Sequence, residues 1–245
     1  MITSVVNEKI KNVCMLHEKK NRDKTGMFII EGDHLVNEAL KHDKLLELYV
    51  LDGCNFDNSF NNKYIVSKNV MEKMSSNKSI PNVLGVAKKN TENKCRGNII
   101  ALDGIQDPGN LGTIIRSSVA FNIDTIILSN DSVDLYNDKV IRSTEGNIFN
   151  INVIRCDLFN ILNELKNNGY DIIGTSVTNG MDVRKINSNK YVLVMGNEGN
   201  GVRKEVSLLC NKNVYISMNS KCESLNVGCS ASILLYELDR GKNDN

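Results

Sequence analysis

The chain has 245 residues and 41% of them are hydrophobic, which is enough to form one large domain or two smaller ones. No run of eighteen apolar residues is present, which excludes a transmembrane helix, and the first residues lack the basic-then-apolar pattern of a secretory signal. We therefore expect a cytoplasmic protein. The formal net charge of +1 excludes a globally basic nucleic-acid binder.

Residues 1–93 predict a small α/β domain. Apolar residues keep helical spacing from Val5 to Leu16, Met27–Ile30 predicts a short strand, and Asp33 is a candidate N-cap for the helix that follows. The other elements predicted here are strands at 45–51, 63–66 and 83–86 and a helix at 70–74. The polar segment 88–97 has nothing to bury, so it is the predicted linker.

Positive charge is concentrated near the N-terminus of this domain. The residues concerned are Lys9, Lys11, Lys19, Lys20, Arg22 and Lys24. A solvated helix face and a phosphate-binding surface explain such a run about equally well.

Residues 98–245 predict a second domain in which apolar strands alternate with helices. The strands are expected at 98–102, 125–128, 171–174, 191–195 and 214–218, and the helices at 111–121, 158–166 and 227–238. Continuous apolar strands are typical of a parallel sheet that is covered on both faces. The fold class is therefore α/β.

Unusual polar residues follow three of these strands, where open α/β sheets bind ligands. The segments are 103–112 with Arg116 behind it, 196–201, and 218–226. Each has an ordinary explanation: Asn110 and Ser224 could cap helices, Arg116 could be a surface residue, and the glycine-rich loop could be a plain turn. The loop spacing, GxxGxG, does not match a dinucleotide-binding fingerprint.

The histidines and cysteines restrict the chemistry further. All three histidines lie in the first domain, so the second has no imidazole that could act as a base or bind a metal. The seven cysteines include no CxxC pair, so we expect reduced thiols and no metal site.

Taken in order, the three segments closely resemble the motifs of the SpoU/TrmH family of RNA ribose 2′-O-methyltransferases. Asp107–Gly112 with Arg116 resembles the first motif, Gly196–Gly201 the second and Glu223–Val227 the third. A weaker family segment resembles residues 139–146, and residues 28–32 resemble the family's frequent N-terminal RNA-binding domain.

This resemblance implies a trefoil-knotted parallel-sheet methyltransferase domain at 98–245, a homodimer, S-adenosylmethionine as cofactor and RNA as substrate, with ribosomal RNA favoured over transfer RNA. The implied catalytic residues are Asn110, Arg116, Glu198, Ser224 and Asn226. The implied cofactor-binding residues are Thr175, Gly196, Ile216, Met218 and Leu225, with the knot formed by residues 175–226. The RNA-binding candidates are Lys19, Lys20, Arg22, Lys24 and Arg142.

By the same resemblance, Arg116 would activate the ribose hydroxyl. A guanidinium effectively never deprotonates, so stabilising a developing alkoxide is the easier role. Two other interpretations remain: an RNA-binding protein of this fold without catalysis, and a dinucleotide-dependent oxidoreductase. The intact motif residues disfavour the first, and the loop spacing disfavours the second.

Overall fold

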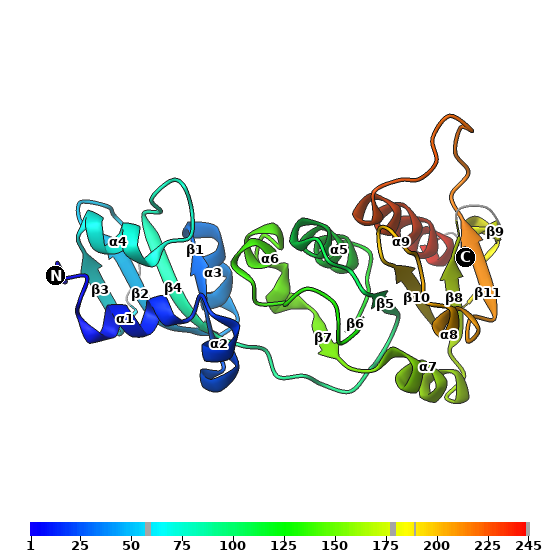
Figure 1. Ribbon diagram of the computed structural model, residues 1–245, viewed down its shortest axis with the longest axis horizontal. Coiled ribbons are helices and arrows are strands. Elements are labelled where there is room, and N and C mark those ends of the chain that lie inside the picture. The colour runs from blue at the N-terminus through cyan, green and yellow to red at the C-terminus, as the bar shows by residue number, and fades with distance from the viewer. Residues whose placement is uncertain (57–59, 177–179, 189, 244–245) are drawn as a thin grey trace. The chain divides into compact units, whose positions relative to one another are not determined.

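The computed structural model describes residues 1–56, 60–176, 180–188 and 190–243 (Figure 1). The chain forms two compact units: Met1–Thr91 with Asp134–Phe149, and Glu92–Val133 with Asn150–Asn245. Segment 134–149, which we expected in the second domain, belongs to the first unit. Its rings of Tyr136 and Phe149 pack on Phe28, with centroids 4.8 and 6.2 Å away.

The first unit contains a mixed four-stranded sheet. Its strands are β1 (Met27–Glu31), β2 (Leu45–Leu51), β3 (Lys63–Val66) and β4 (Val83–Lys88), in the spatial order β1-β4-β2-β3. β4 is antiparallel to both of its neighbours, and β3 is parallel to β2. The helices are α1 (Glu8–Met15), α2 (Lys19–Thr25), α3 (Asp33–Lys41), α4 (Lys68–Met74) and α6 (Asp138–Ser143).

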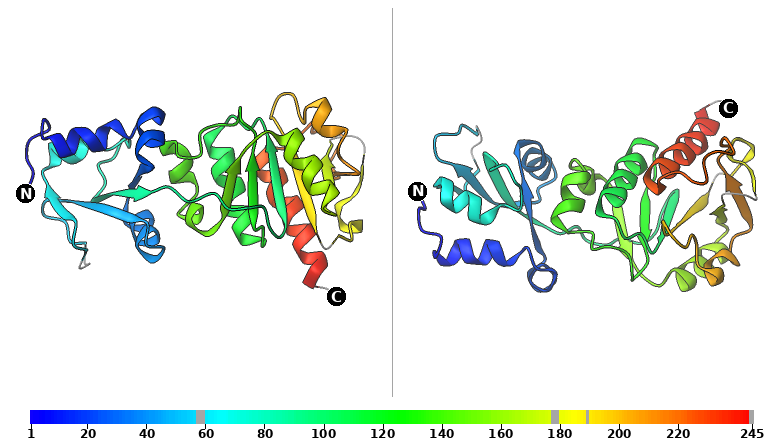
Figure 2. Two further views of the ribbon diagram at one scale, coloured as in Figure 1. Left: turned by 90° about the horizontal axis from the view of Figure 1, so that it is seen from below. Right: turned by 45° about the horizontal axis from the view of Figure 1, so that its top comes forward.

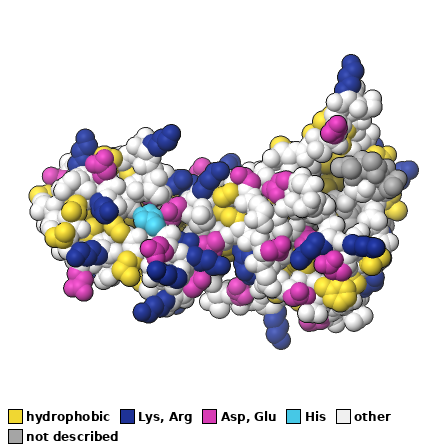
Figure 3. Space-filling model, in the orientation of Figure 1, with side chains coloured by type: hydrophobic (Ala, Val, Ile, Leu, Met, Phe, Trp, Pro, Cys, Tyr) yellow, Lys and Arg dark blue, Asp and Glu magenta, His cyan; other side chains and the backbone are white. Residues whose placement is uncertain are grey.

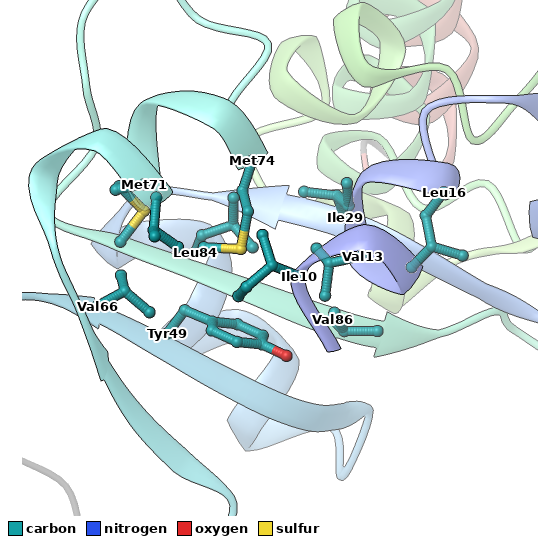
Figure 4. Close-up of a cluster of buried hydrophobic side chains, with 11 residues drawn as sticks. Ile10, Val13, Leu16, Ile29, Tyr49, Val66, Met71, Met74, Leu84 and Val86 are labelled. Atoms are coloured by element: carbon teal, nitrogen blue, oxygen red, sulfur yellow. The ribbon is translucent and has the colours of Figure 1, made fainter. Parts of the chain in front are cut away.

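One core of this unit lies between α1, α4 and the sheet (Figure 4). Ile10 of α1 lies over Tyr49 of the sheet and Val13 over Val86, as the helical spacing predicts. The expected N-cap at Asp33 is wrong. The cap is Gly32, whose φ of 97° and ψ of 157° only glycine adopts easily, so Asp33 becomes the first helical residue.

The second unit contains a seven-stranded sheet in the order β7-β6-β5-β10-β8-β11-β9, and every neighbouring pair is parallel. The strands are β5 (Ile99–Asp103), β6 (Thr125–Leu128), β7 (Asn152–Arg155), β8 (Asp171–Thr175), β9 (Met181–Asp182), β10 (Tyr191–Gly196) and β11 (Lys212–Tyr215). The helices are α5 (Pro108–Ala120), α7 (Leu158–Asn167), α8 (Lys204–Ser207) and α9 (Val227–Asn243), with short 3₁₀ turns at Asn147–Asn150 and Val183–Lys185 along the chain.

Helices cover both faces of this sheet, as expected for parallel strands. α5 and α9 lie side by side on one face, joined by a hydrogen bond between the hydroxyls of Ser117 and Ser232 (2.6 Å), and α7 and α8 lie on the other (Figures 1 and 2). Leu158, Leu162 and Leu165 of α7 are buried against the sheet at helical spacing.

Three strands of this sheet differ from the prediction, and one of them, the two-residue strand β9, was not predicted. The strand expected at 214–218 ends at Tyr215, and Ile216 and Met218 leave the sheet to line a cavity. β7 was not predicted because its only apolar residues are Val153 and Ile154. The sheet order places β5, β10, β8 and β11 next to one another, so the segments that follow these strands meet at one edge.

Candidate active site

Side chains from the three strand-end segments meet in a short chain of hydrogen bonds. The amide of Asn110, on α5, donates to a carboxylate oxygen of Glu198 (2.8 Å). The amide of Asn226, just before α9, donates to the amide oxygen of Asn110 (2.8 Å). Residues up to 116 positions apart in the sequence are thereby joined by direct contact.

Local helix capping holds these side chains in place. A side-chain oxygen of Asp107 accepts from the backbone N–H of Asn110 (2.9 Å), so the N-cap of α5 is Asp107. The side-chain oxygen of Asn226 accepts from the N–H groups of Gly228 and Cys229 (2.9 and 3.2 Å), which is how an N-cap binds the start of a helix. Capping therefore does not explain Asn110 or Ser224.

A cavity of about 700 Å³ opens beside this hydrogen-bond chain. Its lining includes all five expected cofactor residues, Thr175, Gly196, Ile216, Met218 and Leu225, together with Glu198, Ser224 and Asn226. Ligand pockets commonly measure roughly 300–1,000 Å³ and combine an apolar lining with a few polar groups. The residues present thus fit a ligand with the size and mixed polarity of S-adenosylmethionine.

Gly196 has no room for a side chain. A Cβ atom there would lie 2.1 Å from the carbonyl carbon of Gly201 and 2.2 Å from the backbone nitrogen of Val202. The same loop is closed by paired backbone hydrogen bonds between Asn197 and Gly201 (3.0 and 2.9 Å). Gly196 is therefore required by the closure of its own loop, a contact that its sequence spacing does not predict.

Asn197, which was not among the predicted site residues, organises this loop. Its side-chain oxygen accepts from the N–H groups of Gly199 and Asn200 (2.9 and 3.2 Å), and its amide donates to the carbonyl of Gly104 (2.7 Å). The loop of the second motif is thereby fixed to the segment that follows β5.

Asp103 and Arg203 form a second anchor that was not predicted. Asp103 ends β5 and is only 1% exposed. Arg203 donates to its carboxylate from the backbone N–H (2.8 Å) and from Nε (2.7 Å), and Nη2 lies 2.6 Å away. The hydrogen bond with Asp103 is the main reason why the pKa of Arg203 is raised. The sequence signal was a carboxylate directly after the apolar run 99–102.

Arg116 lies apart from this group. It is exposed on α5 and does not line the cavity. Within the part of the chain that the structure describes, its side chain has no hydrogen bond or ion pair. A single chain therefore does not bring Arg116 to Asn110 and Glu198.

The RNA-binding candidates lie in the first unit, and four of the five can reach solvent. Lys19, Lys20 and Lys24 are exposed on α2. The prediction for Arg22 is wrong, because this side chain is buried and its guanidinium donates to two backbone carbonyls and to Asp134. Arg142 is partly exposed on α6.

The surface charge around these residues is mixed. On the face drawn in Figure 3, Lys and Arg side chains are interspersed with Asp and Glu and do not form one continuous basic patch.

None of the described helices has the length and apolar character needed to span a membrane. The described residues also contain no group of three His, Cys, Asp or Glu side chains that could hold a metal ion.

Known proteins with similar sequences and structures share both parts of the chain. The sequence model of the SpoU rRNA Methylase family matches residues 97–236, and that of the MRM3-like substrate binding domain matches residues 7–85. A relative from Bacillus subtilis, the 23S rRNA (guanosine(2553)-2′-O)-methyltransferase RlmP, is 35% identical over 97% of this chain and 98% of its own length.

Two solved structures show the same fold over nearly the whole chain. An AdoMet-bound rRNA methyltransferase from Sinorhizobium meliloti has a TM-score of 0.84 and 26% identity, and covers 98% of this chain and 97% of that one. A structure described as an RNA 2′-O ribose methyltransferase has a TM-score of 0.86 and 27% identity, with 99% of each chain covered. The chain belongs to the SpoU rRNA methylase family and is an S-adenosylmethionine-dependent RNA ribose 2′-O-methyltransferase.

Proposed function

We propose that this enzyme methylates a guanosine 2′-hydroxyl in 23S ribosomal RNA. The hydrogen-bond chain from Glu198 through Asn110 to Asn226, at the cavity, carries the proposal for the reaction. The substrate is supported by the similarity to RlmP, which covers almost the full length of both chains. Such a substrate places the reaction in the cytoplasm.

Methyl transfer makes one bond and breaks another. When bound, S-adenosylmethionine would supply an already activated methyl group whose carbon–sulfur bond breaks as the ribose oxygen bonds to the carbon, and the hydroxyl proton would pass to solvent or phosphate. We assign Thr175, Gly196, Ile216, Met218 and Leu225 to holding this cofactor, and Glu198, Asn110, Ser224 and Asn226 to positioning the ribose beside it.

Arg116 is assigned to stabilising the ribose oxygen as it loses its proton. A guanidinium in a preorganised site contributes by offering N–H donors to developing negative charge. Because Arg116 does not line the cavity of its own chain, we infer that it serves the cavity of a second copy.

A homodimer would make this arrangement possible. Two large apolar side chains of α9, Ile233 and Tyr236, are 40% and 50% exposed, and the ring of Phe121 at the end of α5 meets Tyr236 edge-on. Exposed apolar groups on neighbouring helices suit a symmetric interface. Mixing Arg116→Ala with Glu198→Ala protein should then restore part of the activity, whereas two independent active sites would give none.

We assign RNA binding to residues 1–93 together with segment 134–149, which belongs to the same unit, and catalysis to the rest of residues 98–245, where we also expect the knot at 175–226. Lys19, Lys20, Lys24 and Arg142 are the candidates for phosphate contacts, since each can reach solvent. Their contribution should appear as a salt-dependent affinity, because neutralised phosphates release counterions.

The test is methyl transfer from labelled S-adenosylmethionine to RNA of a strain that lacks the gene, followed by mapping of the modified ribose. We expect one modified guanosine in 23S ribosomal RNA from this strain and none in RNA that already carries the mark. Modification of transfer RNA alone would refute the proposed substrate. Cofactor binding without transfer to either RNA would instead favour an RNA-binding protein that has lost catalysis.

A further inference from the structure

Glu31, the last residue of β1, is a buried carboxylate outside the active site. One of its oxygens accepts from the hydroxyl of Ser75. The other accepts from the backbone N–H of Ser76 (2.9 Å) and from the hydroxyl of Ser76 (2.8 Å). A buried carboxylate therefore fixes the two residues that follow α4.

The Ser76 hydroxyl also forms a hydrogen bond with Arg142, and its bond to Glu31 determines that it is the acceptor in this second bond. A hydroxyl has a single proton, and that of Ser76 points at Glu31. Its lone pairs are left to accept from Nη1 of Arg142 at 2.8 Å. Glu31, Ser76 and Arg142 thus form a relay, a chain of two hydrogen bonds with fixed donor directions that joins a buried carboxylate to a partly exposed guanidinium.

A neutral partner leaves the charge of Arg142 uncompensated. Arg22, Arg184 and Arg203 each form an ion pair with a carboxylate. Arg142 has no carboxylate within ion-pair distance among the described residues, and Ser76 is its one hydrogen-bond partner there. The other N–H groups of its planar fork remain available, and this fork matches the oxygens of a phosphate.

The two segments that carry the relay are also joined by His17. One ring nitrogen lies 2.7 Å from a carboxylate oxygen of Asp138, at the start of α6, and the other lies 2.9 Å from the carbonyl of Met74, directly before Ser75. The helix that carries Arg142 and the turn that carries Ser76 are therefore held by a common side chain.

We propose that Glu31 and Ser76 are positioning residues that orient Arg142 to bind a phosphate of the substrate RNA. This inference rests on the proposed function, since it takes RNA as the substrate. It extends that function by assigning the orientation of one RNA contact to a carboxylate and a serine outside the three motifs. A preorganised side chain loses less conformational entropy on binding. Removing the hydrogen bond that preorganises Arg142 should therefore weaken RNA binding even though the charge of Arg142 remains.

The experiment compares RNA affinity in Ser76→Ala, Arg142→Ala and the double variant, using an in-vitro transcript of the 23S segment that contains the target guanosine. We expect each single change to weaken binding about tenfold, as loss of a charge-assisted hydrogen bond does. The double variant should be no weaker than Arg142→Ala alone, because Ser76 acts through Arg142. Ser76→Thr keeps the hydroxyl and should restore binding, and Glu31→Gln, which loses one acceptor oxygen, should resemble Ser76→Ala.

The matched control is Ser143→Ala, which removes a hydroxyl from the same helix. Among the described residues this hydroxyl bonds only to the carbonyl of Lys139. It should bind RNA like the wild type. Wild-type RNA affinity in Ser76→Ala, or losses that add in the double variant, would overturn the relay. Calorimetry with S-adenosylmethionine should give one affinity for all of these variants. If the wild type modifies transfer RNA instead, the substrate proposal fails, and the same comparison on that RNA still decides the relay.

Discussion

Removing the Arg203 side chain should destabilise the second unit and weaken cofactor binding. In Arg203→Ala, the carboxylate of Asp103, which is 1% exposed in the wild type, loses two of its contacts, from Nε and Nη2, while the backbone N–H of residue 203 remains. The loop of the second motif then loses one of its two anchors to the end of β5, and the other, from Asn197 to Gly104, remains.

The magnitude follows from the burial of the two partners. Removing one member of a fully buried ion pair costs about 3–5 kcal/mol. The side chain of Arg203 is 45% exposed, so water replaces part of the lost contact, and the backbone bond is retained. We therefore expect a loss of about 2 kcal/mol, close to one hydrogen bond to a charged group. For a chain of this size, that lowers the Tm by roughly 4–8 °C.

The assay is thermal unfolding together with calorimetric titration of S-adenosylmethionine, with Arg184→Ala as the matched control. Arg184 forms an ion pair with Asp182 at 2.5 Å and lowers the pKa of that carboxyl to about 2, but both side chains reach solvent, with exposed fractions of 67% and 30%. The control should leave the Tm unchanged, as surface pairs usually do. Equal Tm values for the two variants, or unaltered cofactor affinity in Arg203→Ala, would refute the reasoning.

Three further changes test other parts of the molecule. Arg116→Lys and Arg116→Ala should each lower single-turnover methyl transfer by about two orders of magnitude with cofactor affinity unchanged, and near-normal transfer in the Lys variant would exclude a planar contact. Gly196→Ala should lower cofactor affinity and Tm because its Cβ meets backbone 2.1 Å away, whereas Gly199→Ala, whose nearest neighbour lies 3.5 Å away, should be tolerated; equal behaviour would contradict the loop geometry. The pKa of His17 is raised, mainly by its hydrogen bond to Asp138, with Glu31 adding to the effect. Protonated His17 therefore stabilises the folded state fully below about pH 6.5, and this stabilisation of the fold is lost as the pH rises through the folded-state pKa of His17. Melting curves between pH 6 and 9 should show this loss in the wild type and not in His17→Asn.

Hydrophobic patterns predicted most of the sheet in the second unit because its strands are buried on both faces. The strands at 99–103, 125–128, 171–175 and 191–196 lie within one residue of the predicted bounds. β11 was placed too far along the chain because part of the cavity lining is apolar, so the side chains of Ile216 and Met218 resemble those of a strand. Periodicity does not distinguish packing on a sheet from packing against a ligand.

The three motifs predicted the central residues of the site. Residues whose role depends on contacts between distant parts of the chain were not predicted. Asn110, Glu198 and Asn226 are recognisable in sequence and meet in the structure. The burial of Arg22 could not be predicted, because its partner Asp134 is 112 residues away and the positive residues around it are exposed. Arg203 was missed for the same reason, since its role depends on a carboxylate 100 residues earlier.

The discontinuity of the first unit has a consequence for the order in which the protein can be made. Its last segment, 134–149, leaves the ribosome only after β5, α5 and β6 of the other unit. Until then Phe28 lacks the rings of Tyr136 and Phe149, and buried Arg22 lacks the carboxylate of Asp134. A fragment ending at residue 93 would carry the same defects permanently, so we expect it to aggregate or to melt at a lower temperature. A single cut after residue 93 would not transfer the whole RNA-binding unit, because the segment that supplies Asp134, Tyr136 and Phe149 is encoded between the first and second catalytic motifs.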